Sequence, residues 1–165
     1  MSRHAEVRSS KRSPSSENLA IWREYVETSE RLRTMLAACL HADSELSTGD
    51  YVILLALSEA DGKALRSSEL ADQISWERSR LSHHLRRMES RRIVARQRCV
   101  DDSRGAEVVL TENGAALFRR ASVPHLRAIQ SLFVDGLDLD LLHQVQNINQ
   151  ALNAHLKGLA AAPTS

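Results

Sequence analysis

The chain has 165 residues, of which 42% are hydrophobic, and a formal net charge of +1 at neutral pH. This apolar content is enough for a compact unit with a real core, so disorder throughout the chain is excluded. The opening residues contain no apolar run, and no later stretch approaches the roughly 20 apolar residues of a membrane span. We therefore expect a cytoplasmic protein with no membrane contact.

Charge is strongly segregated along the chain. Residues 1–16 carry about +3, residues 75–104 carry nine arginines against four carboxylates, a balance of +5, and the remainder is about −7. Residues 1–16 have nothing to bury and predict a flexible basic arm. The segment 75–104 lies in a foldable pattern, so its charge indicates an anionic partner.

The first predicted element is a long amphipathic helix over residues 17–41, because apolar residues recur there at three- to four-residue multiples. Thr48 is then expected to cap a helix that runs to Ala60, is apolar nearly all round and is therefore buried. A turn at Asp61-Gly62 and a short strand over 63–66 follow. Ser67 or Ser68 is expected to cap a short helix that ends near Ile74.

Ser75 is expected to end that short helix and to cap another, which runs to Ser90. This second helix has an apolar back formed by Leu81, Leu85 and Met88. Its opposite face carries Ser79, Ser82, His83 and Arg86. Two closely spaced helices of this kind are typical of a helix-turn-helix, whose second helix enters the DNA major groove. Trp76, at the start of this helix, is expected to belong to the core.

Two strand patterns, over residues 93–100 and 107–110, bracket a polar turn at 101–105 and predict a β-hairpin, or wing. Thr111 is expected to cap a helix that Pro124 bends or interrupts. Asp138 is expected to cap the last helix, which carries a stripe of Leu and Val residues with Ile148. The core between the first and last helices is too small to cover both apolar faces, so we expect these helices to pack together across a homodimer.

Specific motifs now point to a family. Asp102-Ser103-Arg104 followed by Leu110-Thr111-Glu112-Asn113-Gly114 resembles the D-x-R…L-T-x-x-G signature of the MarR family of bacterial winged helix-turn-helix regulators. Upstream, Leu70-Ala71, residues 79–82 and residues 85–89 resemble the helix-turn-helix of that family. The resemblance covers roughly residues 20–158. One departure is Arg92, where the family usually has glycine.

The resemblance implies a mainly α fold of the α+β winged-helix type, divided into a basic arm, an N-terminal dimerisation helix, a DNA-binding lobe, C-terminal dimerisation helices and a disordered tail. The corresponding ranges are 1–16, 17–47, 48–111, 112–158 and 159–165. It also implies a repressor that binds a palindromic operator as a homodimer, with recognition helices in successive major grooves and Arg104 of each wing in a minor groove, where a guanidinium is strongly attracted.

The residues predicted to contact double-stranded DNA are Arg78, Ser79, Arg80, Ser82, His83, His84, Arg86, Arg87, Arg98, Asp102, Ser103 and Arg104. The flanking arginines among them are expected to bind phosphates and contribute affinity without specifying sequence. The family also implies a pocket for a small aromatic or anionic effector. Candidates to line it are Trp22, Tyr25, Met35, Tyr51 and His125.

Nothing in the sequence indicates catalysis, a cofactor or a metal. There is no G-x-S-x-G motif or phosphate-binding glycine loop. His83 and His84 are adjacent on a helix and point about 100° apart, and no HxxxH spacing occurs. Cys39 is expected to be a buried, inert thiol, whereas Cys99 lies beside Arg98, a cation that could lower its pKa. Two alternatives stay open: a metal- or redox-responsive regulator on this fold, and a winged-helix module that binds protein.

Overall fold

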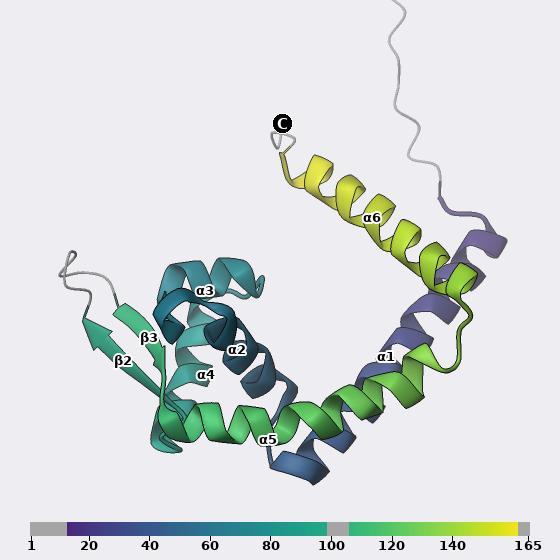
Figure 1. Cartoon of the computed structure of the whole chain (residues 1–165). Coiled ribbons are helices and arrows are strands. Elements are labelled where there is room, and N and C mark those ends of the chain that lie inside the picture. Colours follow the sequence, from purple (N-terminus) through teal and green to yellow (C-terminus); the bar gives the residue numbers. More distant parts are fainter. Residues whose placement is uncertain (1–12, 99–105, 162–165) are drawn as a thin grey trace, which may run out of the picture. The chain divides into compact units, whose positions relative to one another are not determined.

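The computed structural model describes residues 13–98 and 106–161, which form a mainly helical fold with one small sheet (Figure 1). The helices are α1 (Ser16–Ser44), α2 (Thr48–Glu59), α3 (Ser67–Gln73), α4 (Arg78–Ser90), α5 (Glu112–Ile129) and α6 (Leu139–Ala161), with a 3-10 turn η1 (Asp61–Lys63) and a π-helical turn η2 (Gln130–Val134). The strands are β1 (Ala64–Arg66), β2 (Val94–Arg98) and β3 (Ala106–Leu110). The chain divides into two units, residues 1–34 and residues 35–165, and the second holds every element after α1.

The three strands form an antiparallel sheet in the order β1-β3-β2. The central strand β3 pairs Val109 with Ala64 on one side and with Ala95 on the other. Side chains alternate along β3, so that Val108 and Leu110 are buried in the core. The β2–β3 hairpin confirms the predicted wing strands, while the predicted turn between them lies outside the described residues.

Helix α2 lies at the centre of the core of the second unit, as its composition predicts. Ile53, Leu54 and Leu57 are completely buried, and α2 contacts α3, α4, α5 and β3. One face remains partly open at Leu55. The predicted apolar back of α4 is confirmed, because Leu81, Leu85 and Met88 are all buried in the same cluster. This burial fixes which face of α4 points outward.

The cap of α2 is Ser47, one residue before the predicted Thr48. The Ser47 hydroxyl accepts a hydrogen bond from the Asp50 backbone N at 3.1 Å, and the Asp50 carboxylate accepts one from the Ser47 backbone N at 3.0 Å. This capping box needs a side-chain acceptor three residues after the cap. From Thr48 that position would be Tyr51, which is a poor acceptor, so the pair formed by Ser47 and Asp50 decides where α2 begins.

The predicted caps of α3 and α4 are also wrong. Arg66 occupies the N-cap position of α3, and the Ser67 hydroxyl instead donates to the carbonyl of Ala106, which ties α3 to β3. Ser75 does end α3, with a positive φ of 55°, but α4 begins at Arg78, with Glu77 at its N-cap position. Ser75 is itself the residue with left-handed backbone conformation that closes α3, so its side chain does not cap α4.

Thr111 caps α5 as predicted. Its hydroxyl accepts from the Gly114 backbone N at 3.0 Å and donates to the carbonyl of Arg92 at 2.8 Å. The first turn of α5 therefore lies directly on the backbone that enters β2. A Cβ on Gly114 would lie 2.0 Å from the carbonyl oxygen of Ile93, so only glycine fits at this position. Arg92 has a φ of 58°, the conformation for which the family's usual glycine is suited.

Helix α5 continues through Pro124 and passes into the π-helical turn η2. The Asp138 carboxylate accepts a hydrogen bond from the Leu141 backbone N at 2.8 Å, which confirms Asp138 as the cap of α6. None of the helices in the described ranges is long and apolar enough to cross a bilayer.

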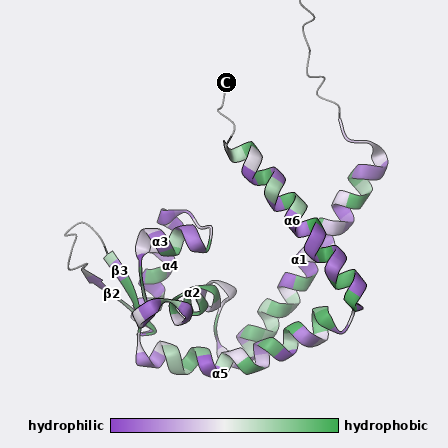
Figure 2. Ribbon diagram, turned by 45° about the horizontal axis from the view of Figure 1, so that its top comes forward, coloured by the Kyte–Doolittle hydropathy of each residue, from purple (hydrophilic) through white to green (hydrophobic). Residues whose placement is uncertain are grey.

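Large apolar side chains remain exposed on α6 and on α1, each considered by itself. Figure 2 shows hydrophobic positions recurring along the ribbons of both helices. On α6 the exposed set comprises Leu139, Leu141, Ile148, Leu152, Leu156 and Leu159, and its last four members follow a helical spacing of three to four residues. On α1 it comprises Leu19, Ile21, Trp22, Tyr25, Val26 and Met35. Apolar rows of this length are unusual on the surface of a monomer and mark contact surfaces.

Candidate DNA-binding surface

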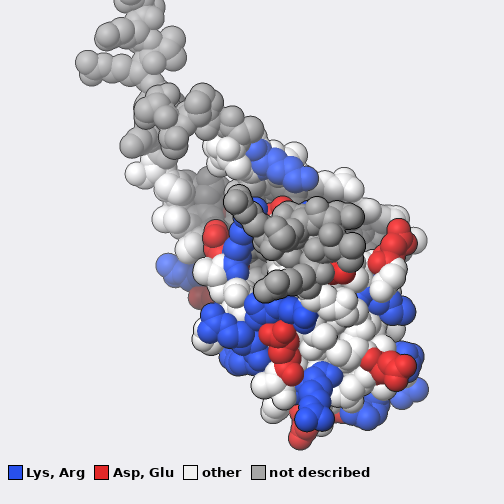
Figure 3. Space-filling view, turned by 90° about the vertical axis from the view of Figure 1, so that its left-hand side faces the viewer, with Lys and Arg blue, Asp and Glu red and all other residues white. Residues whose placement is uncertain are grey.

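The outward face of α4 is polar and cationic. Because Leu81, Leu85 and Met88 anchor the helix in the core, residues at the intervening positions face outward. Those exposed are Arg78, Ser79, Arg80, His83, Arg86 and Arg87, and Ser82 is half-buried. Seen from the side of the wing, the surface of the molecule shows Lys and Arg side chains with carboxylates among them (Figure 3).

Two of the arginines in the basic segment serve the fold. Arg91 donates to the Asp50 carboxylate at 2.8 Å and to the carbonyl of Glu45 at 3.2 Å. Arg96 donates to Glu89 at 2.9 Å and to the carbonyl of Ser82 at 3.3 Å, which joins β2 to α4. Among the described residues, by contrast, no ion pair joins a carboxylate to Arg78, Arg80, Arg86, Arg87 or Arg92. The exposed arginines of α4 are thus not paired with a described carboxylate and are available to bind an external anion.

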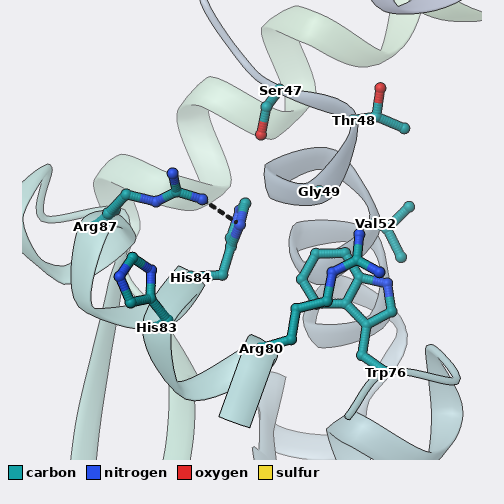
Figure 4. Close-up of a pocket in the computed structure, with 9 residues that line it drawn as sticks. All are labelled: Ser47, Thr48, Gly49, Val52, Trp76, Arg80, His83, His84 and Arg87. Atoms are coloured by element: carbon teal, nitrogen blue, oxygen red, sulfur yellow. Dashed lines mark hydrogen bonds between the residues drawn. The ribbon is translucent and has the colours of Figure 1, made fainter. Parts of the chain in front are cut away.

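A pocket of about 650 Å³ lies between the N-terminus of α2 and the outward face of α4 (Figure 4). Its lining residues are Ser47, Thr48, Gly49, Val52, Trp76, Arg80, His83, His84 and Arg87. Two of them are arginines and two are histidines, and Thr48 and Gly49 belong to the first turn of α2, where backbone N–H groups have no partner within the helix. The pocket is therefore suited to an anionic group.

Asp50 organises the floor of this region. Its side chain is only 6% exposed, and its carboxylate accepts hydrogen bonds from His84 Nε2 at 2.9 Å, from Arg91 and from the Ser47 backbone. Burial alone raises the pKa of Asp50, but these hydrogen bonds outweigh it and hold the pKa well below its usual range. Asp50 is therefore a fixed negative charge that joins α2 to α4 and to the residue after α4.

Trp76 packs partly against the core, as predicted, and it also supports the pocket. The Arg80 guanidinium lies over the Trp76 ring at 4.1 Å, and the ring meets His84 edge-on at 5.3 Å (Figure 4). A Cβ on Gly49 would approach both Trp76 and His84 at 2.8 Å. The absence of a side chain at Gly49 is what lets α2 approach these two rings so closely.

The structure brings part of the predicted DNA-binding set together and leaves part of it undescribed. Arg78, Ser79, Arg80, Ser82, His83, His84, Arg86 and Arg87 all lie on α4. His84 differs from the rest, since it is only 11% exposed and both its ring nitrogens have partners. Arg98 ends β2 but its side chain is not described, and Asp102, Ser103 and Arg104 lie outside the described residues.

Sequence reasoning missed Asp50. The available signal was the Ser47-x-x-Asp50 spacing of a capping box immediately before an apolar helix. That signal would have placed the cap correctly and predicted a carboxylate at the start of α2. It would not have revealed the partners Arg91 and His84, which lie 41 and 34 residues later in the chain.

Two of the five predicted effector residues contact each other, and the other three are exposed. Tyr51 and His125 meet with ring centroids 4.4 Å apart, and Phe118 lies 5.2 Å from Tyr51. The Nδ1 atom of His125 is buried without a hydrogen-bond partner among the described residues. Met35 is exposed, as are Trp22 and Tyr25 in the first unit. Only Tyr51 and His125 of the predicted set are thus in contact.

Cys39 is a free, half-buried thiol rather than a fully buried one, because α1 leaves part of its surface uncovered there. Cys99 lies outside the described residues. Within residues 13–98 and 106–161, no group of three or more His, Cys, Asp or Glu side chains is arranged to hold a metal ion.

Burial lowers the pKa of His125 below its ordinary value of 6.5, because the charged imidazolium is poorly solvated there. The unfolded chain therefore binds a proton at His125 more readily than the folded chain, so this residue reduces the free energy of unfolding as the pH falls below about 6.5. We expect the unfolding temperature to fall less between pH 7.5 and pH 5.5 in a His125→Phe variant, which retains a ring against Tyr51. The exposed His155→Ala is the control, and an equal fall in both variants would contradict the assignment.

Comparison with known proteins places the chain near one group of regulators. Residues 36–120 match the model of the SarA/Rot transcriptional regulator family. AbsC, a MarR family transcriptional regulator from Streptomyces coelicolor, is 32% identical with a TM-score of 0.83, over 89% of this chain and 99% of AbsC. No curated protein sequence matched the chain.

Two further structures were determined with DNA. Sco3205, a MarR family transcriptional regulator from Streptomyces coelicolor in complex with DNA, is 30% identical with a TM-score of 0.84, over 88% of this chain and 91% of Sco3205. A cysteine-to-serine variant of MarR from E. coli, complexed with operator DNA, is 20% identical with a TM-score of 0.75, over 86% of this chain and 99% of that one. At that identity the E. coli structure supports the fold alone.

Proposed function

Since this chain belongs to the MarR family of transcriptional regulators, we propose that it represses transcription in the cytoplasm by binding a palindromic operator as a homodimer. It is a DNA-binding regulator of the winged-helix type rather than an enzyme. The observation that carries this proposal is the orientation of α4. Its buried Leu81, Leu85 and Met88 turn outward a row of arginines that form no ion pair with a described carboxylate.

In this proposal α4 enters the major groove. Arg78 and Arg86 are long enough to donate two hydrogen bonds to a guanine edge, and Ser79, Ser82 and His83 supply shorter polar contacts. Arg80 and Arg87 contact phosphates. Sequence specificity then comes from the first group and most of the salt-dependent affinity from the second.

The wing contributes Arg104, by resemblance to the family signature. We expect Arg104→Ala to weaken binding to the specific operator by about 1–3 kcal/mol and to lower the slope of log affinity against log salt by about one. Both values follow from fluorescence anisotropy titrations at several salt concentrations. Arg127→Ala, which removes an exposed arginine of α5 outside the predicted set, is the control. An Arg104→Ala protein with wild-type affinity and slope would refute the wing contact.

The homodimer accounts for the apolar rows on α1 and α6. A twofold interface built from terminal helices buries the same residues on both protomers, and it sets the two recognition helices about one DNA turn apart. The operator should accordingly consist of two inverted half-sites.

An effector pocket beside Tyr51 and His125 completes the proposal. These rings offer an aromatic surface, and the buried Nδ1 of His125 has no hydrogen-bond partner among the described residues. A small aromatic or anionic molecule bound there would release the operator by changing the separation of the recognition helices. Operator affinity that stays constant across a panel of phenolic acids would count against this part of the proposal.

The deciding experiment is fluorescence anisotropy with the DNA upstream of the protein's own gene and with a scrambled duplex, at about 0.15 M salt. At this salt concentration non-specific binding is no tighter than micromolar. Nanomolar affinity for the upstream DNA alone would establish an autoregulatory operator. For a general search, the wild-type protein would select duplexes from a randomised pool, and failure to enrich any sequence would overturn operator binding.

A further inference from the structure

His84 is held from both sides of its ring. Its Nε2 atom lies 2.9 Å from Oδ1 of Asp50, and its Nδ1 atom lies 2.8 Å from Nη2 of Arg87 (Figure 4). The ring is nearly buried and meets Trp76 edge-on, and there is no room for a side chain at Gly49 beside it. The imidazole therefore has one orientation, which is set by α2.

The chemistry of the three groups fixes the direction of each hydrogen bond. A guanidinium only donates, so Arg87 donates to Nδ1 of His84. A carboxylate only accepts, so Nε2–H of His84 donates to Asp50. The imidazole consistent with both contacts is the neutral form with its proton on Nε2. Asp50 determines this tautomer, and the tautomer leaves the acceptor on the side of Arg87.

Arg87 is in turn exposed at the rim of the pocket. It uses one of its five N–H donors on His84, which leaves four for an anion. A free arginine loses much of its side-chain freedom when it binds a phosphate, and a guanidinium that is already oriented loses less. The contact to His84 therefore prepares Arg87 for binding without neutralising its charge.

We propose that Asp50 and His84 are positioning residues that hold the Arg87 guanidinium in place for a phosphate of the DNA backbone. This inference rests on the proposed function and deepens it. His84 then acts through Arg87 rather than by touching DNA itself, which separates it from the other predicted contacts on α4. Because a phosphate contact is independent of sequence, the effect extends to any duplex.

The test is a double-mutant cycle on DNA affinity at about 50 mM salt, with a mixed-sequence duplex and, in parallel, with a selected operator. His84→Gln keeps an amide donor that can reach Asp50 and removes the acceptor used by Arg87. Arg87→Ala removes the proposed phosphate contact. We expect each variant to weaken binding by about 3- to 10-fold per half-site, and the double variant to be no weaker than Arg87→Ala alone.

The control cycle pairs His84→Gln with Arg86→Ala. Arg86 is an exposed arginine on the same helix that lies outside the proposed relay of Asp50, His84 and Arg87, so here the two effects should multiply. The salt slope should fall for Arg87→Ala and stay at the wild-type value for His84→Gln, which removes no charge. Thermal unfolding of each variant checks that α4 remains folded, and His84→Asn, which retains an acceptor near Nδ1, should recover part of the affinity.

Multiplicative losses for His84→Gln and Arg87→Ala, or wild-type affinity for either, would overturn the relay even while specific operator binding stands. Failure of the wild-type protein to prefer any sequence would overturn the proposed operator function. In that case the cycle on the mixed-sequence duplex would still decide the relay, since it measures phosphate binding alone.

Discussion

The double substitution Ile148→Asp and Leu152→Asp should leave the protein monomeric and weaken its binding to a two-half-site operator by about 100-fold or more. The two side chains are 57% and 40% exposed on α6, so the substitutions create no cavity in the core. In a twofold interface they would bring four carboxylates into a buried apolar patch, where unpaired charge is costly. A monomer binds each half-site separately and loses the effective concentration that links the two binding events.

Sedimentation velocity would give the oligomeric state, and anisotropy with single and paired half-sites would give the affinity. Asn147→Asp with Ala154→Asp is the matched control, because it adds the same charge on a different face of the same helix. We expect this control to remain dimeric. A dimer with unchanged affinity in the Ile148 and Leu152 variant would mean that α6 is not part of the interface.

Gly114→Ala should destabilise the protein by about 3 kcal/mol or more, a large share of the stability of a small domain. The added methyl group would lie 2.0 Å from the carbonyl oxygen of Ile93, and backbone atoms cannot rotate away as a flexible side chain can. Either α5 must withdraw, which breaks the Thr111 cap and its bond to the carbonyl of Arg92, or β2 must move. Urea unfolding followed by circular dichroism would measure the loss.

A glycine-to-alanine substitution in α6 should not destabilise the protein. Gly158 lies within α6, and a Cβ added there would have no neighbouring atom within 4 Å. Gly158→Ala therefore gains helix propensity at no steric cost and should be neutral or stabilising by up to about 1 kcal/mol. If Gly114→Ala were as stable as wild type, the close approach of α5 to β2 described above would be wrong.

The helices and most of the core could be predicted from the sequence because both follow from periodicity. Leu81, Leu85 and Met88 are buried where their spacing predicts, and Thr111 and Asp138 cap the helices that they precede. The errors at Thr48 and Ser75 have a common cause. Several serines and threonines compete at each helix start, and the choice depends on a partner three residues later or on a backbone conformation that composition does not reveal.

The candidate site could be predicted less completely, since its electrostatics depend on long-range pairing. The basic segment contains nine arginines, but their positions in the sequence do not tell which of them meet carboxylates. Arg91 is paired with Asp50 across 41 residues, while the neighbouring Arg87 is not paired with any described carboxylate. The family resemblance was informative where periodicity was not, at Gly114 and at Arg92, whose positive φ preserves a glycine-like turn.

Asp50 and Tyr51 are consecutive residues in the first turn of α2, yet they contact different helices. Asp50 holds His84 of α4, and Tyr51 meets Phe118 and His125 of α5. An α-helix turn is stiff, so a rotation of α2 that moves one of these side chains moves the other by the same angle. A rotation of α2 that displaces Tyr51 would therefore also move Asp50 and its contact with His84 of α4, because a single peptide bond joins the two residues.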